Sequence, residues 1–507
     1  MAVVCVDVGT TVIKAVGYDE DGAEAVIVRR ATTVSRPAPG WAEQSMPDVW
    51  DCVADSIRSV VDQLGSPIAF VAVTAQGDGC WLVDDQGTPT GTAILWNDGR
   101  AKEIVDRWSQ RGVLDRAFAI NGSQTFAGLP NAILTWLRQY DPGRLERSAA
   151  ALTCGGWIFA QLTGEVAADE SDGSAPFMDI HARRYSARLL QLYDMAWARR
   201  LLPGLRDDHR RVGVLRAAAA DRINLPEGTP VVMAPYDIAT TAIGVGAVRP
   251  GQACSILGTT LCTEVVTTTP DLGVDPAGLT VAFGVENRYL RAFPTLVGGE
   301  VIQWACALLQ LAEPDQLTEL AMRGAPGADG LIFLPYLSPV GERAPFLDPL
   351  IRGTFLGLTL LHRREDLARS VLEGLSFAIA DCLTASRAHP IDLRVTGGGA
   401  ASAGWLRLIA DITGVPVLRS ADVEAGARGA FLVGLLATGR AKTMDLAVER
   451  YVRARDTFRP DPAVTAYYAG TFVDFIDIRR HVAALGPRLA AVRARPVPAA
   501  TGAGTPT

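Results

Sequence analysis

A single carboxylate interrupts the first apolar run of the chain. The stretch Val3–Lys14 reads V-V-C-V-D-V-G-T-T-V-I-K, in which Asp7 precedes a Gly-Thr-Thr turn. An unpaired carboxylate inside a sheet costs free energy, so Asp7 is expected to be either paired or part of a reactive site. Gly9 permits a tight turn, and Thr10 and Thr11 add hydroxyls beside exposed N–H groups. Such a turn suits a phosphate oxygen or a metal-bound phosphate. The alternative is an edge hairpin with Asp7 in an Asx turn.

A second carboxylate follows a second apolar strand pattern. Asp237 comes after Val231–Ala234 and precedes a predicted helix, Ile238–Gly246. It could act as a base while Asp7 faces a metal ion, or it could simply cap the helix. Phosphoryl transfer depends mainly on positioning and charge neutralisation, which two such carboxylates and a phosphate-binding turn would supply.

The Gly-Thr-Thr turn occurs twice. It returns at 258–260, after the β-forming stretch Ala253–Leu257 and about half a chain length beyond Gly9. A repeat of this kind predicts two similar domains that arose by duplication and that could hold a polyphosphate between them. A connector, R-P-G at 249–251, separates them. The predicted division is therefore 1–246 for the first domain, 247–485 for the second and 486–507 for a disordered tail.

Glycines and polar residues follow two further predicted strands. Leu393–Thr396 leads into G-G-G-A-A-S at 397–402 and then a helix. Glycines let an anion approach the backbone, and a helix N-terminus offers N–H groups. The motif is neither a Walker A motif nor a dinucleotide fingerprint, and it could be a plain turn. Q-G-D-G at 76–79 follows the strand predicted at Ile68–Thr74, where open α/β sheets bind ligands. Asp78 could equally be a turn residue, and Trp96 a core aromatic residue.

Composition limits the possible functions. A chain of 507 residues exceeds a single core, so at least two domains are expected. A formal net charge of -7 and the lack of a basic run argue against a nucleic-acid partner. Eight scattered cysteines without a C-x-x-C pair predict free thiols in a reducing compartment. No signal peptide or membrane-spanning apolar run is evident, which predicts a cytoplasmic protein with no membrane partner.

The elements that would position these residues are those of an α/β protein. Val3–Val8, Lys14–Tyr18 and Val26–Ser35 predict three consecutive antiparallel strands, and a helix is predicted at Pro47–Leu64. Residues 115–220 read as mostly helical, with a polar and irregular stretch at Asp169–Asp179.

Taken in order, the motifs resemble those of the FGGY carbohydrate kinases, within the sugar kinase/actin/Hsp70 superfamily. The resemblance covers roughly residues 3–475 and is specific because the motifs occur in the expected sequence. They are D-V-G-T-T-V-I-K (7–14), G-W-A-E-Q (40–44), A-I-L-W-N-D-G-R (93–100), P-Y-D (235–237), G-T-T (258–260), G-E-R-A-P-F-L-D-P (341–349), L-E-G-L-S-F (372–377) and G-G-G-A-A-S (397–402).

This resemblance implies two ribonuclease-H-like (actin-like ATPase) α/β domains flanking a cleft. It also implies ATP with Mg2+, a small sugar or polyol as the phosphate acceptor, and a homodimer. Asp237 matches the catalytic base, and Asp7 together with Asp237 matches the metal-associated carboxylates. The acceptor-site positions are Gln76, Gly77, Asp78, Trp96 and Asp237. The nucleotide-site positions are Thr10, Thr11, Lys14, Gly258, Thr259, Thr260, Gly299, Gln303, Gly398, Gly399 and Ala400.

The acceptor itself is not fixed by these motifs. Q-G-D-G at 76–79 resembles erythritol kinases, whereas xylulokinases usually carry Met-His at 77–78 and glycerol kinases carry Arg-Glu. Ile238 stands where the family usually has Asn or Gln. The predicted substrate is therefore a four- or five-carbon polyol or ketose, with D-xylulose as the family's default. The alternative is a catalytically inactive sensor of the same fold that binds ATP and a sugar.

Overall fold

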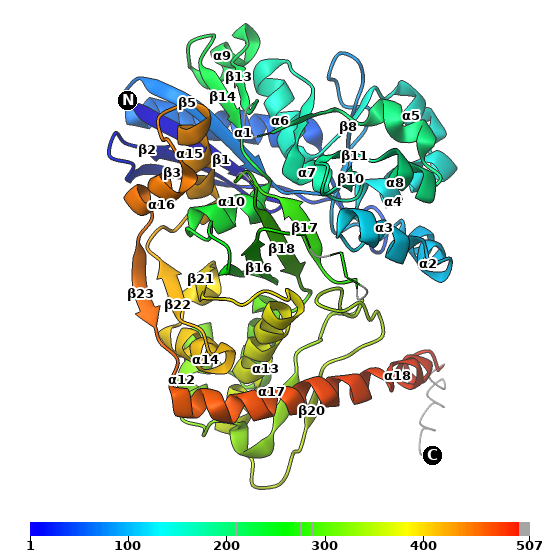
Figure 1. The fold of residues 1–507 in the computed structure, drawn as a ribbon, viewed down its shortest axis with the longest axis vertical. Helices are drawn as coiled ribbons and strands as arrows, with labels where there is room; N and C mark the ends of the chain where they lie inside the picture. The colour runs from blue at the N-terminus through cyan, green and yellow to red at the C-terminus, as the bar shows by residue number, and fades with distance from the viewer. Residues whose placement is uncertain (208–209, 271, 274–275, 286, 496–507) are drawn as a thin grey trace, which may run out of the picture.

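Two mixed sheets of similar topology organise the chain (Figure 1). The computed structural model describes residues 1–207, 210–270, 272–273, 276–285 and 287–495. From edge to edge, the first sheet contains β13 (Val212–Val214), β14 (Pro230–Met233), β5 (Ile68–Ala75), β1 (Ala2–Val8), β2 (Val12–Tyr18) and β3 (Glu24–Ala31). The second contains β17 (Leu279–Ala282), β18 (Tyr289–Pro294), β16 (Leu261–Thr267), β15 (Gln252–Leu257), β21 (Asp392–Thr396), β22 (Val417–Ser420) and β23 (Ala454–Phe458).

The strand order repeats between the two halves. In the first sheet, β1, β2 and β3 pair antiparallel, while β5 and β14 continue parallel to β1. In the second sheet, β15, β16 and β18 pair antiparallel, while β21 and β22 continue parallel to β15. The prediction of an α/β protein with two similar halves is confirmed, and each Gly-Thr-Thr turn joins the first two strands of its sheet.

Helices cover the outer face of each sheet and build a lobe on the first half. The first half holds α1 (Met46–Leu64), α2 (Lys102–Gln110), α3 (Val113–Asn121), α4 (Pro130–Tyr140), α5 (Pro142–Arg147), α6 (Cys154–Thr163), α7 (Glu170–Ser174), α8 (Ala187–Leu192), η1 (Ala196–Leu201), α9 (Ala217–Ile223) and α10 (Asp237–Gly244). The second half holds α11 (Gly299–Leu308), α12 (Pro314–Ala321), η2 (Ala328–Gly330), α13 (Arg364–Ala385), η3 (Gly398–Ala401), α14 (Ala403–Thr413), α15 (Ala425–Ala437), α16 (Met444–Tyr451), α17 (Pro462–Ala483) and α18 (Gly486–Arg493). Short two-stranded pairings involve β4 (Glu43–Gln44), β6 (Trp81–Val83), β7 (Ala93–Ile94), β8 (Ala150–Leu152), β9 (Ala167–Asp169), β10 (Met178–Asp179), β11 (Arg184–Tyr185), β12 (Gly204–Arg206), β19 (Ile332–Leu334) and β20 (Thr354–Leu356).

The alternation of side chains along β1 decides where Asp7 points. Val4 and Val6 pack into the core beneath α1, whereas Cys5 packs into the core shared with α10 and α15. Side chains two residues apart lie on the same face of a strand. Asp7 therefore follows Cys5 onto the face that α10 and α15 cover.

Helices α10 and α15 form a layer between the two sheets. Their core includes Cys5 of β1 and Cys254 of β15, one residue from each sheet. Figure 1 shows α15, in orange, beside the blue strands β1 and β5, so a late segment of the chain packs on the first sheet. Gly244 of α10 and Gly429 of α15 allow this approach, because a Cβ atom on either would lie 1.8 Å from a backbone oxygen of the opposite helix.

Two sequence-based expectations need correction. Residues 169–179 are not wholly irregular, because α7 forms there and the Asp169 carboxylate caps it by accepting from the Ser171 N–H at 2.9 Å. The predicted disordered tail is wrong for Gly486–Arg493, which forms α18. Pro487 stands at its start and good helix formers follow. Residues 496–507 lie outside the described part of the chain.

Two other expectations can be compared with the structure. All eight cysteines are free, as predicted. Among the described residues, no helix combines the length and the apolarity needed to cross a membrane.

The α10–α15 contact should tolerate no extra atom. Gly429→Ala would force a methyl group against the Thr240 carbonyl, and we expect a loss of about 1–3 kcal/mol in the free energy of unfolding. Gly470→Ala is the matched control, since this helical glycine of α17 is exposed and has open space around it. The control should stabilise the chain by about 0.5–1 kcal/mol. Urea unfolding measures the free energy of unfolding of both variants. Equal changes in Gly429→Ala and Gly470→Ala would contradict the close-packing argument.

Candidate active site

A cavity of about 280 Å³ lies between the two halves of the molecule. Its volume is close to the lower end of the range of small-molecule sites. We call it the central cavity. The residues in its wall are Asp7, Gly9, Thr10, Lys14, Gly77, Asp78, Trp96, Tyr236, Asp237, Ile238, Thr241, Ile256, Thr260, Cys262, Leu279, Pro294 and Arg343.

Asp7 enters the central cavity from the end of β1 and is paired with one cation. The Lys14 ammonium lies 3.6 Å from its carboxylate and 3.3 Å from that of Glu424, which also binds Arg29 at 2.6 Å. Burial raises the pKa of Asp7, and Lys14 partly opposes the rise. Burial lowers the pKa of Lys14, but the two carboxylates outweigh it and raise the pKa overall, so the ammonium stays charged. The ion pair with Lys14 accounts for the buried carboxylate of Asp7, so an Asx turn is not needed to explain it.

Asp237 faces the same cavity from the first turn of α10. The helix begins at Asp237 with Tyr236 as its N-cap, so Asp237 is not the cap residue. One carboxylate oxygen accepts from the Ile238 N–H at 2.8 Å, which fixes the side chain. Burial, followed by the negative charge of Asp7, raises the pKa of Asp237 to about 7. The structure thus contains a carboxylate whose proton affinity suits a general base near neutral pH.

A hydrogen-bond chain holds the first Gly-Thr-Thr turn. The Thr10 hydroxyl donates to Gln76 Oε1 at 2.7 Å and accepts from Trp96 Nε1 at 2.9 Å. The Gln76 amide nitrogen donates to Gln44 Oε1 at 2.8 Å, and Gln44 in turn donates to the Thr10 carbonyl at 2.9 Å. Gln76 is buried beneath the turn and is not part of the cavity wall, whereas Trp96 lines the cavity.

The neighbouring turn presents Asp78 to the central cavity. Asp78 adopts a left-handed backbone conformation with φ of 55°, so it is a turn residue as well as a lining residue. Gly77 is required there, because a Cβ atom would lie 2.2 Å from the Tyr236 ring. Burial raises the pKa of Asp78 to about 7, and Arg343 partly opposes the rise.

Several other predicted nucleotide-site residues lie at the carboxyl end of β15, and of these only Thr260 belongs to the wall of the central cavity, as far as the described residues define it. The Gly299 N–H donates to the Gly258 carbonyl at 2.9 Å, which ties the start of α11 to the second Gly-Thr-Thr turn. A Cβ atom at Gly397 would lie 2.8 Å from the Leu257 carbonyl, so the glycine turn after β21 reaches the same point, whereas Gly398 has open space around it. The predicted residues absent from the central cavity wall are Thr11, Gln76, Gly258, Thr259, Gly299, Gln303, Gly398, Gly399 and Ala400.

Two charged residues of the site had no assigned role in the sequence. Arg343 belongs to the G-E-R-A-P-F-L-D-P motif, which the sequence predicted only to be a rigid loop. In the structure its side chain lines the central cavity. Glu424 precedes α15 and contacts Lys14, but no local pattern marks it.

Comparison with known proteins agrees with this arrangement. The N-terminal domain of the FGGY family of carbohydrate kinases matches residues 2–244, and the C-terminal domain of that family matches residues 253–438. The chain belongs to the FGGY family of carbohydrate kinases. It is a sugar kinase, a phosphotransferase with an alcohol group as acceptor, and kinases of this family use ATP as the phosphate donor.

Several relatives of this FGGY kinase match over most of their length. An erythritol kinase from Brucella abortus is 31% identical, with 96% of this chain and 98% of the relative covered. A xylulose kinase from Escherichia coli is 30% identical over 81% of this chain and 84% of the relative. The crystal structure of a xylulose kinase from Rhodospirillum rubrum matches with a TM-score of 0.87 and 27% identity, over 97% of this chain and all of that one (100%). A ligand-bound xylulose kinase from Lactobacillus acidophilus shares the fold, with a TM-score of 0.90 at 24% identity over 96% and 99% of the two chains.

The raised pKa of Asp237 predicts a pH-dependent effect on stability. In the unfolded chain an aspartate titrates near 3.9, so the folded state penalises the charged form, increasingly as the pH rises from about 4 to about 7. Asp237→Asn should therefore raise the midpoint of unfolding more at pH 8 than at pH 5. Thermal unfolding at both pH values measures this, with exposed Asp221→Asn as the control. If Asp237→Asn raised the midpoint of unfolding equally at pH 5 and pH 8, the raised pKa of Asp237 would be contradicted.

Proposed function

We propose that this FGGY kinase transfers the γ-phosphoryl group of ATP to a terminal hydroxyl of a four- or five-carbon polyol or ketose, such as erythritol or xylulose, with Asp237 as general base. The observation that carries the proposal is the position of Asp237. Its carboxylate is held by the Ile238 N–H and faces the same cavity as Asp7. The erythritol kinase and xylulose kinase relatives support the choice of acceptor.

In the proposed reaction Asp237 accepts the proton of the attacking hydroxyl. That oxygen forms a bond to the γ-phosphorus, the bond from phosphorus to the oxygen bridging the β-phosphate breaks, and ADP leaves. Asp237 then releases the proton to solvent. General-base assistance of this kind contributes on the order of 10²–10⁴-fold to the rate.

The nucleotide site is proposed on the second half, next to the central cavity. The charged ammonium of Lys14 and the turn that carries Thr10 and Thr11 would meet the phosphates from the first half. The second half would contribute its Gly-Thr-Thr turn and the open glycine turn after β21. Their residues are Gly258, Thr259, Thr260, Gly299, Gln303, Gly398, Gly399 and Ala400.

The residues present fit a magnesium ion that retains other ligands. Asp7 and Asp237 supply oxygen ligands, and the described residues include no cluster of three or more His, Cys, Asp or Glu side chains suited to a metal ion. Mg2+ is commonly bound through one or two carboxylates together with water and substrate phosphates. Asp7 would hold the ion, directly or through water, with the Asp237 carboxylate beside it. The ion would neutralise phosphate charge when bound.

The proposed acceptor site comprises Gly77, Asp78 and Trp96 in the cavity wall, with Gln76 supporting them from beneath. Ile238 also lines the cavity, so a polar contact usual in the family is missing beside the reacting centre. Asp78 offers two carboxylate oxygens to acceptor hydroxyls.

An acceptor panel tests the proposal. ADP release should be measured over glycerol, erythritol, D- and L-xylulose, D- and L-ribulose and the corresponding pentitols. We expect turnover with at least one four- or five-carbon compound. Asp237→Asn should lower kcat by roughly 10²–10⁴-fold while ATP binding persists, and Asp221→Asn should leave both unchanged. No ADP above background with any acceptor, or a near-normal kcat for Asp237→Asn, would contradict the proposal.

A further inference from the structure

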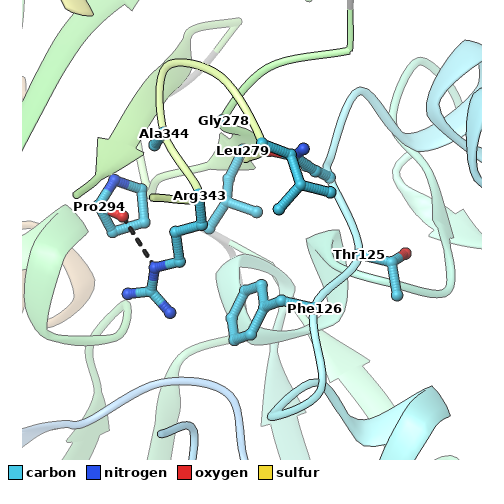
Figure 2. Close-up of a pocket in the computed structure, with 9 residues that line it drawn as sticks. Thr125, Phe126, Gly278, Leu279, Pro294, Arg343 and Ala344 are labelled. Atoms are coloured by element: carbon cyan, nitrogen blue, oxygen red, sulfur yellow. Dashed lines mark hydrogen bonds between the residues drawn. The ribbon is translucent and has the colours of Figure 1, made fainter. Parts of the chain in front are cut away.

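Arg343 is held at the central cavity by its own loop. The Glu342 carboxylate accepts from the N–H groups of Leu296 and Arg343, both at 2.8 Å, which fixes the loop on β18's end. The Arg343 Nε–H donates to the Pro294 carbonyl at 2.9 Å, as Figure 2 shows. The stem and one donor of the guanidinium are therefore committed to the second half of the molecule.

The other end of the guanidinium faces the first half. Its central carbon lies 5.2 Å from the Trp96 ring centroid and 4.8 Å from that of Phe126. In the described part of the chain, Nη1 and Nη2 have no hydrogen-bond or ion-pair partner. A guanidinium has five N–H donors, and those on Nη1 and Nη2 stay accessible to a ligand, because neither nitrogen is among the buried unpaired atoms of the described residues. Arg343 thus has hydrogen-bonding capacity directed at the cavity.

Asp78 is its complement across the same cavity. The Asp78 carboxylate likewise has no hydrogen-bond or ion-pair partner among the residues that the structure describes, and it does not pair with Arg343. The two charges nevertheless influence each other, since each shifts the pKa of the other towards its charged form. The ionised Asp78 carboxylate, which Arg343 favours, only accepts hydrogen bonds, and the Arg343 guanidinium only donates them. Facing one cavity, the two groups complement a hydroxyl, which does both.

We infer that Arg343 and Asp78 together recognise a non-reacting hydroxyl of the acceptor, and that their paired opposite charges select uncharged polyols or ketoses over sugar acids. This inference rests on the proposed function and adds Arg343 as a specificity-determining residue. A carboxylate on the acceptor would be drawn to Arg343 but repelled by Asp78. A hydroxyl can accept from the guanidinium and donate to the carboxylate at once.

A second, smaller cavity lies beside Arg343. This cavity of about 20 Å³ is the one drawn in Figure 2. It shares Leu279, Pro294 and Arg343 with the wall of the central cavity. That volume holds about one water molecule. Arg343 therefore stands between the two cavities, at this end of the proposed acceptor site.

Steady-state kinetics of Arg343→Gln test the inference. Loss of charged hydrogen bonds should raise the KM of the best uncharged acceptor roughly 10- to 100-fold, while the KM for ATP and the midpoint of unfolding stay near wild type. Arg352→Gln is the matched control, because it removes the same charge from the same segment. Within the described part of the chain, the Arg352 guanidinium donates only to the carbonyls of residues 339, 349 and 351. If Arg343→Gln does not fold, Arg343→Lys replaces it in the same measurement. The expected rise in acceptor KM is then smaller.

Two further comparisons decide the mechanism of recognition. If one hydroxyl bridges Asp78 and Arg343, the two substitutions should not act independently. The double variant carrying Asp78→Asn and Arg343→Gln should then lose less kcat/KM than the product of the losses in the two single variants. The wild type should prefer a pentitol to the corresponding aldonate, and Asp78→Asn should narrow that preference. Three results would overturn this inference but not the proposed function. They are an unchanged acceptor KM in Arg343→Gln, losses in kcat/KM that multiply in the double variant, and a wild type that prefers the aldonate. A wild type without turnover on any acceptor would overturn the proposed function with it.

Discussion

The close contact between α10 and α15 is the constraint on which the site depends. Gly244 and Gly429 let the two helices approach until no Cβ atom fits, and both helices lie between the sheets. Asp237 starts α10, and Glu424 immediately precedes α15. Packing that holds the halves together therefore also brings a carboxylate from each helix start to Asp7 and Lys14 at the end of the first hairpin.

Much of this arrangement could be predicted because it is encoded in short stretches. The period of two along β1 indicates which face Asp7 takes, and the repeated Gly-Thr-Thr turn predicts two sheets of one topology. Asp237 was recognisable as a strand-end carboxylate before a helix. The family motifs, in their order, identified the kinase fold, and the domain matches agree.

The rest depends on tertiary contacts that no local pattern reveals. Glu424 reaches Lys14 only because α15 returns to the first sheet. Arg343 could be seen in a motif, but its approach to Trp96 and Phe126 requires the two halves to meet. Gln76 was expected to line the acceptor site, whereas both ends of its amide are used beneath the Thr10 turn. The prediction of disorder was wrong for Gly486–Arg493, because an Ala and Pro content typical of disorder is equally compatible with a short helix that has proline in its first turn.

The central claim is that a hydroxyl in the central cavity attacks the γ-phosphoryl group with Asp237 as its proton acceptor. The most direct measurement is phosphorus NMR of the reaction mixture with ATP and either erythritol or D-xylulose. The account predicts a phosphomonoester on a terminal carbon that accumulates one for one with ADP and is not formed at a comparable rate by Asp237→Asn. Accumulation of inorganic phosphate alone, or the same ester formed equally fast by Asp237→Asn, would contradict it.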